Sequence, residues 1–189
     1  MRTPLAIVAA LSLLPGCLGP RVDGSRYFTL PVAGAPAEGA PVAALGLGPV
    51  TLPPYLSRSE IATRVSPEQV TYSGNDRWAA PLEEQVGRAL AEELRARLPA
   101  REVVRWPWAL SPGPDVAVAV DFLRFEAASG GGATLHARWT VTVRGKAPLS
   151  GETRIEEPGG PGDVRASVAA MGRALSALAG QLVGAAGTR

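Results

Sequence analysis

Two stretches of the chain repeat apolar residues with the period of an α-helix. The first covers residues 82–98, where a leucine or valine returns at every fourth position and charged residues fill many of the positions between. Pro81 suits the first turn of this helix, and Pro99 ends it. The second covers residues 164–182, with spacings of three and four, and Asp163 precedes it as a candidate N-cap. The pattern therefore predicts two amphipathic helices.

Alternation of apolar and polar residues, the period of a β-strand, marks three segments between the predicted helices. They cover residues 116–125, 134–144 and 149–156. The second alternates cleanly and is typical of a half-buried antiparallel strand. In the first, the phase shifts at Leu123, which predicts either a β-bulge or a strand that is buried on both faces.

Weaker strand signals are spread over the first half of the chain. They cover residues 27–30, 43–50, 61–65 and 70–72. The last two predict a small hairpin. Between the second and the third lies the segment 51–56, which contains Pro53 and Pro54. Because proline donates no backbone hydrogen bond, we expect a stiff extended loop or a sheet edge there and not a central strand.

The order of these elements, strands and a helix followed again by strands and a helix, indicates an α+β fold. We predict a mixed, largely antiparallel sheet with the two amphipathic helices packed on one face. A single domain is expected over residues 27–184, which is long enough to bury a core of its own. Residues 185–189 are expected to form a flexible C-terminal tail.

The first residues have the pattern of a signal peptide. Arg2 supplies a positive charge, and residues 4–14 form an apolar run that is too short to span a bilayer as a helix, which takes about 20 residues. The run ends in Leu14-Pro15-Gly16-Cys17, which resembles the lipobox of bacterial lipoproteins. We therefore predict a lipoprotein signal peptide over residues 1–16, acylation of the cysteine thiol, with palmitate among the acyl groups, and a lipidated tether over residues 17–26.

Cys17 is the only cysteine in the chain of 189 residues, so it cannot form an internal disulfide. A lone thiol in an exported protein needs another purpose, and lipidation supplies one. Acylation of both the thiol and the new amino terminus would exceed what stable membrane anchoring requires. Two alternatives remain: an ordinary secretory signal with an incidental cysteine, and a cytosolic protein with an apolar start.

The charge balance and the scarcity of reactive side chains exclude several function classes. The chain has 19 basic and 17 acidic residues, without the clustered basic face that nucleic-acid binding requires. His136 is the only histidine and lies on the polar face of its strand, so it has no second histidine for a zinc site and no nucleophile motif for a catalytic triad. Asp121 is expected to face outward beside a charged neighbour. We predict no catalytic residue, no metal and no cofactor.

Aromatic residues outside the regular patterns are candidates for a partner surface. Trp78 either packs against the start of the first helix or faces a partner, and Trp106-Pro107-Trp108 is ambiguous in the same way. Pro107 is expected to keep that segment extended, so that the two indole rings can point to opposite sides.

The two prolines before Tyr55 hold its segment stiff, so less entropy is lost when it docks onto a partner. Rigid aromatic residues and arginines are also the types enriched at binding hot spots. We therefore predict a partner surface formed by Tyr55, Leu56, Arg58, Arg77 and Trp78. The alternative is that Tyr55 and Leu56 pack into the core and close the edge of the sheet.

Several short motifs, taken in this order, resemble the auxiliary lipoprotein family of ABC-type transport systems. They are Tyr27–Pro31, Leu47–Leu56, Ile61–Arg64, Asp76–Leu82, Trp106–Trp108, Phe122–Glu126 and Ala137–Trp139. The resemblance extends from the lipobox to about residue 183 in the predicted C-terminal helix. Ser57-Arg58-Ser59 departs from the family, which tends to have an acidic or polar residue, arginine and then proline there.

The resemblance implies a non-catalytic lipoprotein of the outer membrane that faces the periplasm. Family members work with MCE-domain proteins that bridge the envelope and move lipids, and an inner-membrane ABC transporter powers some of these systems. Leu18 follows the cysteine, in place of the aspartate that would favour retention in the inner membrane. We expect a role in membrane integrity, a lipid anchor in the membrane, an MCE-domain partner, a capacity for homo-oligomers and no nucleic-acid partner.

Two other function classes compete with this interpretation. A lipoprotein hydrolase would need a nucleophile motif, which the chain lacks. A lipoprotein that itself binds a lipid or another small apolar ligand would need a deep apolar cavity between the helices and the sheet. The small residues of the second predicted helix favour close packing in place of such a cavity.

Overall fold

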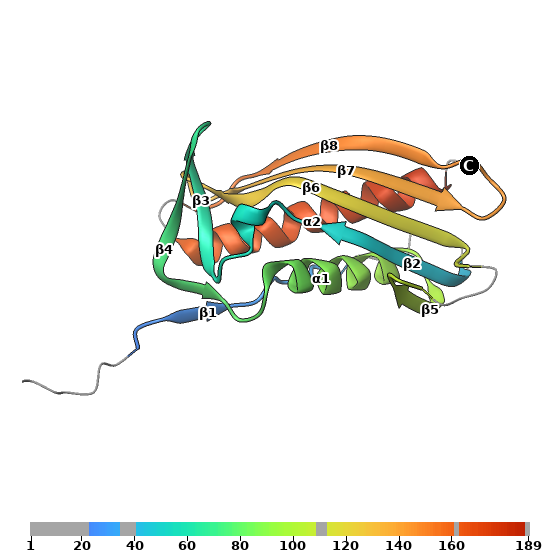
Figure 1. The fold of residues 1–189 in the computed structure, drawn as a ribbon, viewed down its shortest axis with the longest axis horizontal. Helices are drawn as coiled ribbons and strands as arrows, with labels where there is room; N and C mark the ends of the chain where they lie inside the picture. The colour runs from blue at the N-terminus through green and yellow to red at the C-terminus, as the bar shows by residue number, and fades with distance from the viewer. Residues whose placement is uncertain (1–22, 35–40, 109–112, 161–162, 188–189) are drawn as a thin grey trace, which may run out of the picture.

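An open sheet of eight strands forms the frame of the domain, and two α-helices cover one of its faces (Figure 1). The computed structural model describes residues 23–34, 41–108, 113–160 and 163–187. The predicted signal peptide, Cys17 and the tether up to residue 22 lie outside the described residues. The predicted α+β class with a mixed sheet is confirmed; the two longest of its seven strand pairings and one other are antiparallel, and the remaining four are parallel.

Most of the observed elements fall on segments that the sequence pattern predicts. In chain order they are β1 (Arg26–Phe28), β2 (Val42–Thr51), the 3-10 helix η1 (Pro54–Leu56), β3 (Glu60–Ser66), β4 (Gln69–Trp78), α1 (Leu82–Arg97), β5 (Ala100–Arg105), β6 (Val116–Ala128), β7 (Ala133–Val143), β8 (Leu149–Glu157) and α2 (Val164–Gly187). Only β5 and η1 have no counterpart among the predicted elements.

β6 lies at the centre of the sheet. β7 pairs with it antiparallel along most of its length, and β8 pairs with β7. The other edge of β6 is shared by two strands, because β2 runs parallel to its first half and β3 to its last residues. β5 extends the sheet beyond β2, and β4 and β1 extend it beyond β3. In Figure 1, β3 and β4 form a hairpin that stands at one end of the long strands.

The predicted irregularity at Leu123 is a β-bulge. The register between β6 and β7 shifts between Phe122 and Arg124. Before the bulge, Val120 and Phe122 face the core, and after it Phe125 does. The extra residue therefore changes which positions of β6 point inward, as expected for a bulge.

Both helices contribute to one apolar core. α2 packs against β6, β7 and β8, while α1 packs against α2 and β2. The side chains that fill the space between them are fully buried and include Leu45, Leu90, Leu94, Phe122, Phe125, Leu135, Met171, Leu175 and Leu178. α2 is long and apolar enough to cross a membrane by composition, but 61% of its most apolar window is buried inside the domain. It is therefore a core helix of this fold.

α2 extends beyond the predicted domain boundary at residue 184. Asp163 caps its start, since its Oδ1 accepts a hydrogen bond from Arg165 N at 2.9 Å. The helix ends at Gly187, so the tail predicted for residues 185–189 is helical over its first three residues. Ala185 and Ala186 are half-buried and pack against the core, which favours continuation of the helix over a free tail.

Two local predictions are wrong and one strand, β5, is not among the predicted elements; tertiary contacts explain all three. The last three residues of the segment predicted to be extended, residues 51–56, form η1, because Leu56 is buried beneath it and proline suits the first helical position. Half of the residues of β5 are charged, so its sequence shows no strand period, and only its parallel pairing with β2 defines it. The rings of Trp106 and Trp108 do not splay apart but meet edge to face, with centroids 4.9 Å apart, above β2.

The segment that leads from the tether into the domain is held by both helices. Gln85 Oε1 accepts a hydrogen bond from Leu30 N at 2.8 Å. Glu93 Oε1 accepts one from Ala33 N at 2.6 Å. From α2, Gly172 leaves room for Pro31, whose Cγ would lie 2.6 Å from a β-carbon at that position. The point at which a lipid anchor would pull on the domain is therefore fixed to its core.

Candidate functional site

The residues predicted to form a partner surface come together around η1 and the base of the β3–β4 hairpin. Ser59 joins the two segments, since its carbonyl accepts a hydrogen bond from Trp78 N at 2.7 Å and its hydroxyl accepts one from Arg77 Nη1 at 3.4 Å. Glu60 lies 3.5 Å from Arg58 Nε and 3.7 Å from Arg77 Nη1. One carboxylate thus gathers two arginines that lie far apart in the sequence.

Two of the five predicted residues are buried. Leu56 is 4% exposed and Trp78 is 5% exposed, and both belong to the main core. The burial of Leu56 corresponds to the alternative in which its segment packs into the core at the edge of the sheet, and the burial of Trp78 corresponds to inward packing in place of a partner contact. Arg58 is well exposed and Arg77 is partly exposed, so a partner can reach both guanidinium groups.

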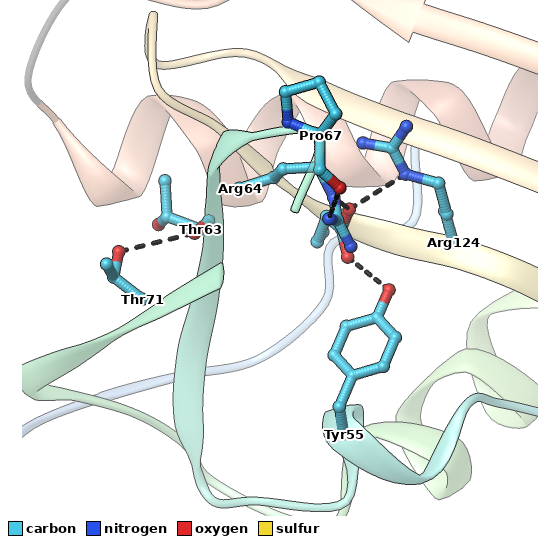
Figure 2. A network of polar contacts seen from close by, with 7 residues as sticks. Tyr55, Thr63, Arg64, Pro67, Thr71 and Arg124 are labelled. Atoms are coloured by element: carbon cyan, nitrogen blue, oxygen red, sulfur yellow. Dashed lines mark hydrogen bonds and ion pairs between the residues drawn. The ribbon is translucent and has the colours of Figure 1, made fainter. Parts of the chain in front are cut away.

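Tyr55 is held by Glu126, a carboxylate that is only 1% exposed. The Tyr55 hydroxyl donates a hydrogen bond to one carboxylate oxygen, and Arg64 Nε donates to the other. Arg124 Nε donates to the same oxygen as Arg64, at 3.0 Å. Figure 2 shows Tyr55, Arg64 and Arg124 converging from η1, β3 and β6. The network therefore ties η1 and the hairpin to the central strand.

The surroundings of Glu126 favour its ionised form. Burial by itself would raise the pKa of Glu126, but the hydrogen bonds from Arg64, Tyr55 and Arg124 outweigh burial and hold this pKa below its ordinary value. For Tyr55, burial and the adjacent Glu126 carboxylate raise the pKa of the phenol to about 12. At neutral pH the phenol therefore stays protonated and donates to a charged acceptor, which makes a strong hydrogen bond.

Tyr72 of β4 braces the base of the hairpin. Its hydroxyl donates a hydrogen bond to Tyr55 O at 3.0 Å, and the Arg58 guanidinium lies 4.5 Å from the centre of its ring. Near the hairpin turn, Arg64 Nη1 donates to Pro67 O at 2.9 Å (Figure 2). Because the Tyr72 ring positions the Arg58 guanidinium before any partner binds, Arg58 loses less side-chain entropy on binding.

A comparison with known protein families identifies the family of this chain. The sequence profile of the family described as ABC-type transport auxiliary lipoprotein component matches residues 28–183. The chain belongs to this family. The match covers the sheet from the end of β1 and nearly all of α2, so the resemblance expected from the short motifs is confirmed. Membership supports a transport-auxiliary, non-enzymatic role at the cell envelope.

Relatives of this auxiliary lipoprotein include Intermembrane transport lipoprotein PqiC of Escherichia coli, which is 28% identical over 110 residues. That alignment covers 57% of this chain and 58% of PqiC, so the chain spans little more than half the length of the curated relatives it matches. A solved structure of an uncharacterised protein superposes with a TM-score of 0.70 at 19% identity, covering 86% of this chain and 98% of the other. A Xanthomonas campestris protein gives 0.69 at 18% identity, with 87% and 95% covered. At such identities the two structures show the fold alone.

The residues that hold the surface of this auxiliary lipoprotein in place are not recognisable from the sequence. Glu126 follows Phe125 on a strand whose phase has shifted, and its burial depends on η1 and the hairpin covering it. Tyr72 and Arg64 belong to a hairpin whose sequence predicts strands but not their contacts. The single sequence signal is that Glu126 ends one of the motifs that resemble the family.

The remaining polar residues singled out from the sequence are paired on the face of the sheet away from the helices. His136 Nε2 lies 2.6 Å from Glu152 Oε1, and Asp121 Oδ1 accepts a hydrogen bond from Thr51 Oγ1 at 2.6 Å. In the part of the chain that the structure describes, no group of three or more His, Cys, Asp and Glu side chains could hold a metal ion.

Proposed function

We propose that the mature protein is a lipid-anchored, non-catalytic auxiliary component of an envelope lipid transport system that supports membrane integrity. It is anchored in the outer membrane through Cys17, faces the periplasm and docks onto an MCE-domain protein of an ABC-type system. The family match over residues 28–183 carries this proposal, because it spans nearly the whole fold. The lipobox before Cys17 and the relative named Intermembrane transport lipoprotein PqiC support it further.

The proposed docking surface is the one that presents Arg58 and Arg77, with Tyr55, Leu56 and Trp78 as its support from below. Arg58 and Arg77 present two guanidinium groups on this surface, beside the carboxylate of Glu60. An acidic region of the partner would therefore be steered toward it. Leu56 and Trp78 contribute by fixing the backbone, since both are buried.

The alternative of a lipoprotein that carries an apolar ligand itself receives no support from the core. Among the described residues, the space between the helices and the sheet is filled by side chains such as Leu90, Phe125, Leu135 and Leu175, each fully buried. A lipid chain could enter there only by displacing packed side chains, which would cost several kcal/mol.

The anchor is tested by Cys17→Ser. Expressed in a Gram-negative host, the wild-type protein should lose residues 1–16, gain acyl chains and sediment with the outer membrane. Cys17→Ser should lose the acyl mass and most of its membrane attachment, because the thiol that carries the lipid is gone. Mass spectrometry and membrane fractionation measure both effects.

Leu18→Asp provides the matched control for the anchor. It keeps the cysteine, so it should be acylated like the wild type, yet the aspartate should retain it in the inner membrane. Membrane attachment of Cys17→Ser at the wild-type level would refute anchoring through Cys17. A Leu18→Asp protein that still fractionates with the outer membrane would refute sorting by residue 18.

The docking surface is tested by Arg58→Ala combined with Arg77→Ala. We expect this variant to bind the MCE-domain protein about tenfold more weakly and with a shallower salt dependence, since steering charges are lost. Its melting temperature should stay near the wild-type value, because exposed ion pairs add at most about 1 kcal/mol. Arg154→Ala on β8, an exposed arginine away from the surface, is the control and should bind normally. Full affinity in the double variant would place the docking surface elsewhere.

A further inference from the structure

A second surface feature is a groove between the first half of α1, the end of β2 and the side chain of Trp106. It has a volume of about 530 Å³, within the range of ligand-binding clefts. Pro49 and Thr51 of β2 line one side, and Glu83, Glu84 and Gly87 of α1 line another. β2, whose last residues line the groove, ends at Thr51, and η1 of the proposed docking surface begins at Pro54.

Gly87 forms part of the groove wall, at a position where packing inside the domain does not require a glycine. It lies inside α1, where glycine is the least favourable residue apart from proline. A β-carbon added at Gly87 would meet no atom within 4 Å, whereas one at Gly172 would collide with Pro31. Packing among the described residues therefore does not require glycine at this position. Gly87 itself is buried, but it lines the groove and leaves room there for a side chain from outside.

Trp106 borders the same space and is held rigidly although it is 55% exposed. Its ring meets Trp108 edge to face, and the backbone N–H of Trp106 donates a hydrogen bond to Leu47 O at 2.8 Å. Gly48 makes the close approach to β2 possible, since a β-carbon there would lie 2.7 Å from Trp106 Cβ. An exposed tryptophan fixed by its own surroundings is the kind of residue that acts as a binding hot spot.

The α1 side of the groove is acidic. Glu83 and Glu84 are exposed in the first turn of α1, where their negative charges interact favourably with the helix dipole. Neither carboxylate forms a salt bridge in the part of the chain that the structure describes. Arg105 stands at the β5 side of the groove, next to Trp106. A basic group that enters beside Gly87 would therefore find two unpaired acceptors.

We propose that this groove binds a peptide segment of the partner transport protein in which a bulky apolar side chain is followed or preceded closely by lysine or arginine. The apolar side chain occupies the space above Gly87 against the Trp106 ring, and the basic side chain pairs with Glu83 and Glu84. The identity of the partner rests on the proposed function, whereas the peptide chemistry rests on the groove itself.

The test uses the mature lipoprotein in detergent micelles and a random dodecapeptide library displayed on phage as the probe. We expect the enriched peptides to carry an aromatic or large aliphatic residue within a few positions of lysine or arginine. Gly87→Leu and Trp106→Ala should each weaken binding of these peptides about tenfold or more, measured by fluorescence anisotropy. Glu83→Lys combined with Glu84→Lys should shift the selection toward acidic peptides.

Gly184→Leu is the matched control, since Gly184 is an exposed glycine of α2 where an added β-carbon also meets no atom within 4 Å. Both glycine variants should melt at or above the wild-type temperature, because leucine favours a helix more than glycine does. Only Gly87→Leu should lose peptide binding. Unaltered binding by Gly87→Leu, an empty selection, or a wild-type dimer that Gly87→Leu dissociates would overturn the proposal, the last by assigning the groove to a second copy of the chain.

The two proposals fail separately. Peptide binding that depends on Gly87 and Trp106, without any binding of an MCE-domain protein, would refute the proposed function but support the groove as a peptide-binding site. Binding of the MCE-domain protein that Gly87→Leu and Trp106→Ala leave unchanged would refute the groove and leave the proposed function intact.

Discussion

Replacing Glu126 with alanine is expected to lower the free energy of unfolding by about 3–5 kcal/mol, the cost of breaking a buried ion pair. Three donors meet at this carboxylate, from Tyr55, Arg64 and Arg124. Without it, the mostly buried Arg64 guanidinium and the Tyr55 hydroxyl lose their partner where water has little access. Urea unfolding at pH 7, followed by circular dichroism, measures the change.

The pH dependence of stability gives an independent check on Glu126. Its pKa in the folded protein lies below the ordinary value of 4.5, so the carboxylate contributes stability that is fully present above pH 4.5 and is lost as the pH falls through the folded pKa. Glu126→Gln removes this contribution, so the stability difference between wild type and variant should shrink in acid. The pKa of Tyr55 should also fall from about 12 in this variant, which an ultraviolet titration detects.

Glu156→Ala is the matched control for Glu126, because Glu156 is exposed on β8. Its effect should stay within about 0.5 kcal/mol. A Glu126→Ala protein that unfolds at the wild-type urea concentration would show that the network does not hold η1 and the hairpin to β6.

Glu93→Ala is expected to destabilise the protein by a similar amount, about 3–5 kcal/mol. This buried carboxylate joins three elements, since it accepts hydrogen bonds from Arg97 of α1, from Ser176 of α2 and from the backbone of residues 33 and 34. Burial opposes its ionisation, but these donors outweigh burial and hold the pKa of Glu93 below its ordinary value. Removing the carboxylate takes away the buried acceptor to which Arg97 Nη1 and the Ser176 hydroxyl donate.

Glu92→Ala on the same helix is the control, because Glu92 is half exposed and forms only a surface pair with Arg88 at 3.2 Å. It should change stability by at most about 1 kcal/mol. Hydrogen exchange gives a local measure, since the amides of Ala33 and Gly34 should exchange faster in Glu93→Ala alone. Equal exchange and equal unfolding in the two variants would contradict the role assigned to Glu93.

The long elements of this fold are predictable because their signals are local. The apolar spacing of four residues in α1, that of three and four in α2, and the alternation in β7 and β8 follow from which side chains face the core, and each run is long enough to show its period. The bulge in β6 is visible for the same reason, as a change of phase at Leu123. In contrast, β5 is a short edge strand with three charged residues, so its pairing with β2 could not be read from its own sequence.

The candidate site is only partly predictable. The sequence points to the segments that carry Arg58 and Arg77, and the structure brings both arginines to Glu60. It cannot say that Leu56 and Trp78 are buried, because an apolar residue in an irregular segment is equally suited to a core or a partner. Glu126 and Glu93 escape prediction for the opposite reason, since acidic side chains are buried only where a fold supplies their donors.

The sequence by itself determined the family resemblance, the lipobox pattern, the α+β class and the position of both helices, because short-range patterns encode these features. The tertiary structure alone decided which charged residues are buried, where η1 and β5 lie, and that Gly87 of α1 borders a groove. Glu126 meets Arg64 and Tyr55, and Trp106 stands near Gly87, through contacts between residues far apart in the chain. Such contacts leave no period in the sequence, since their partners are set by the packing of whole elements.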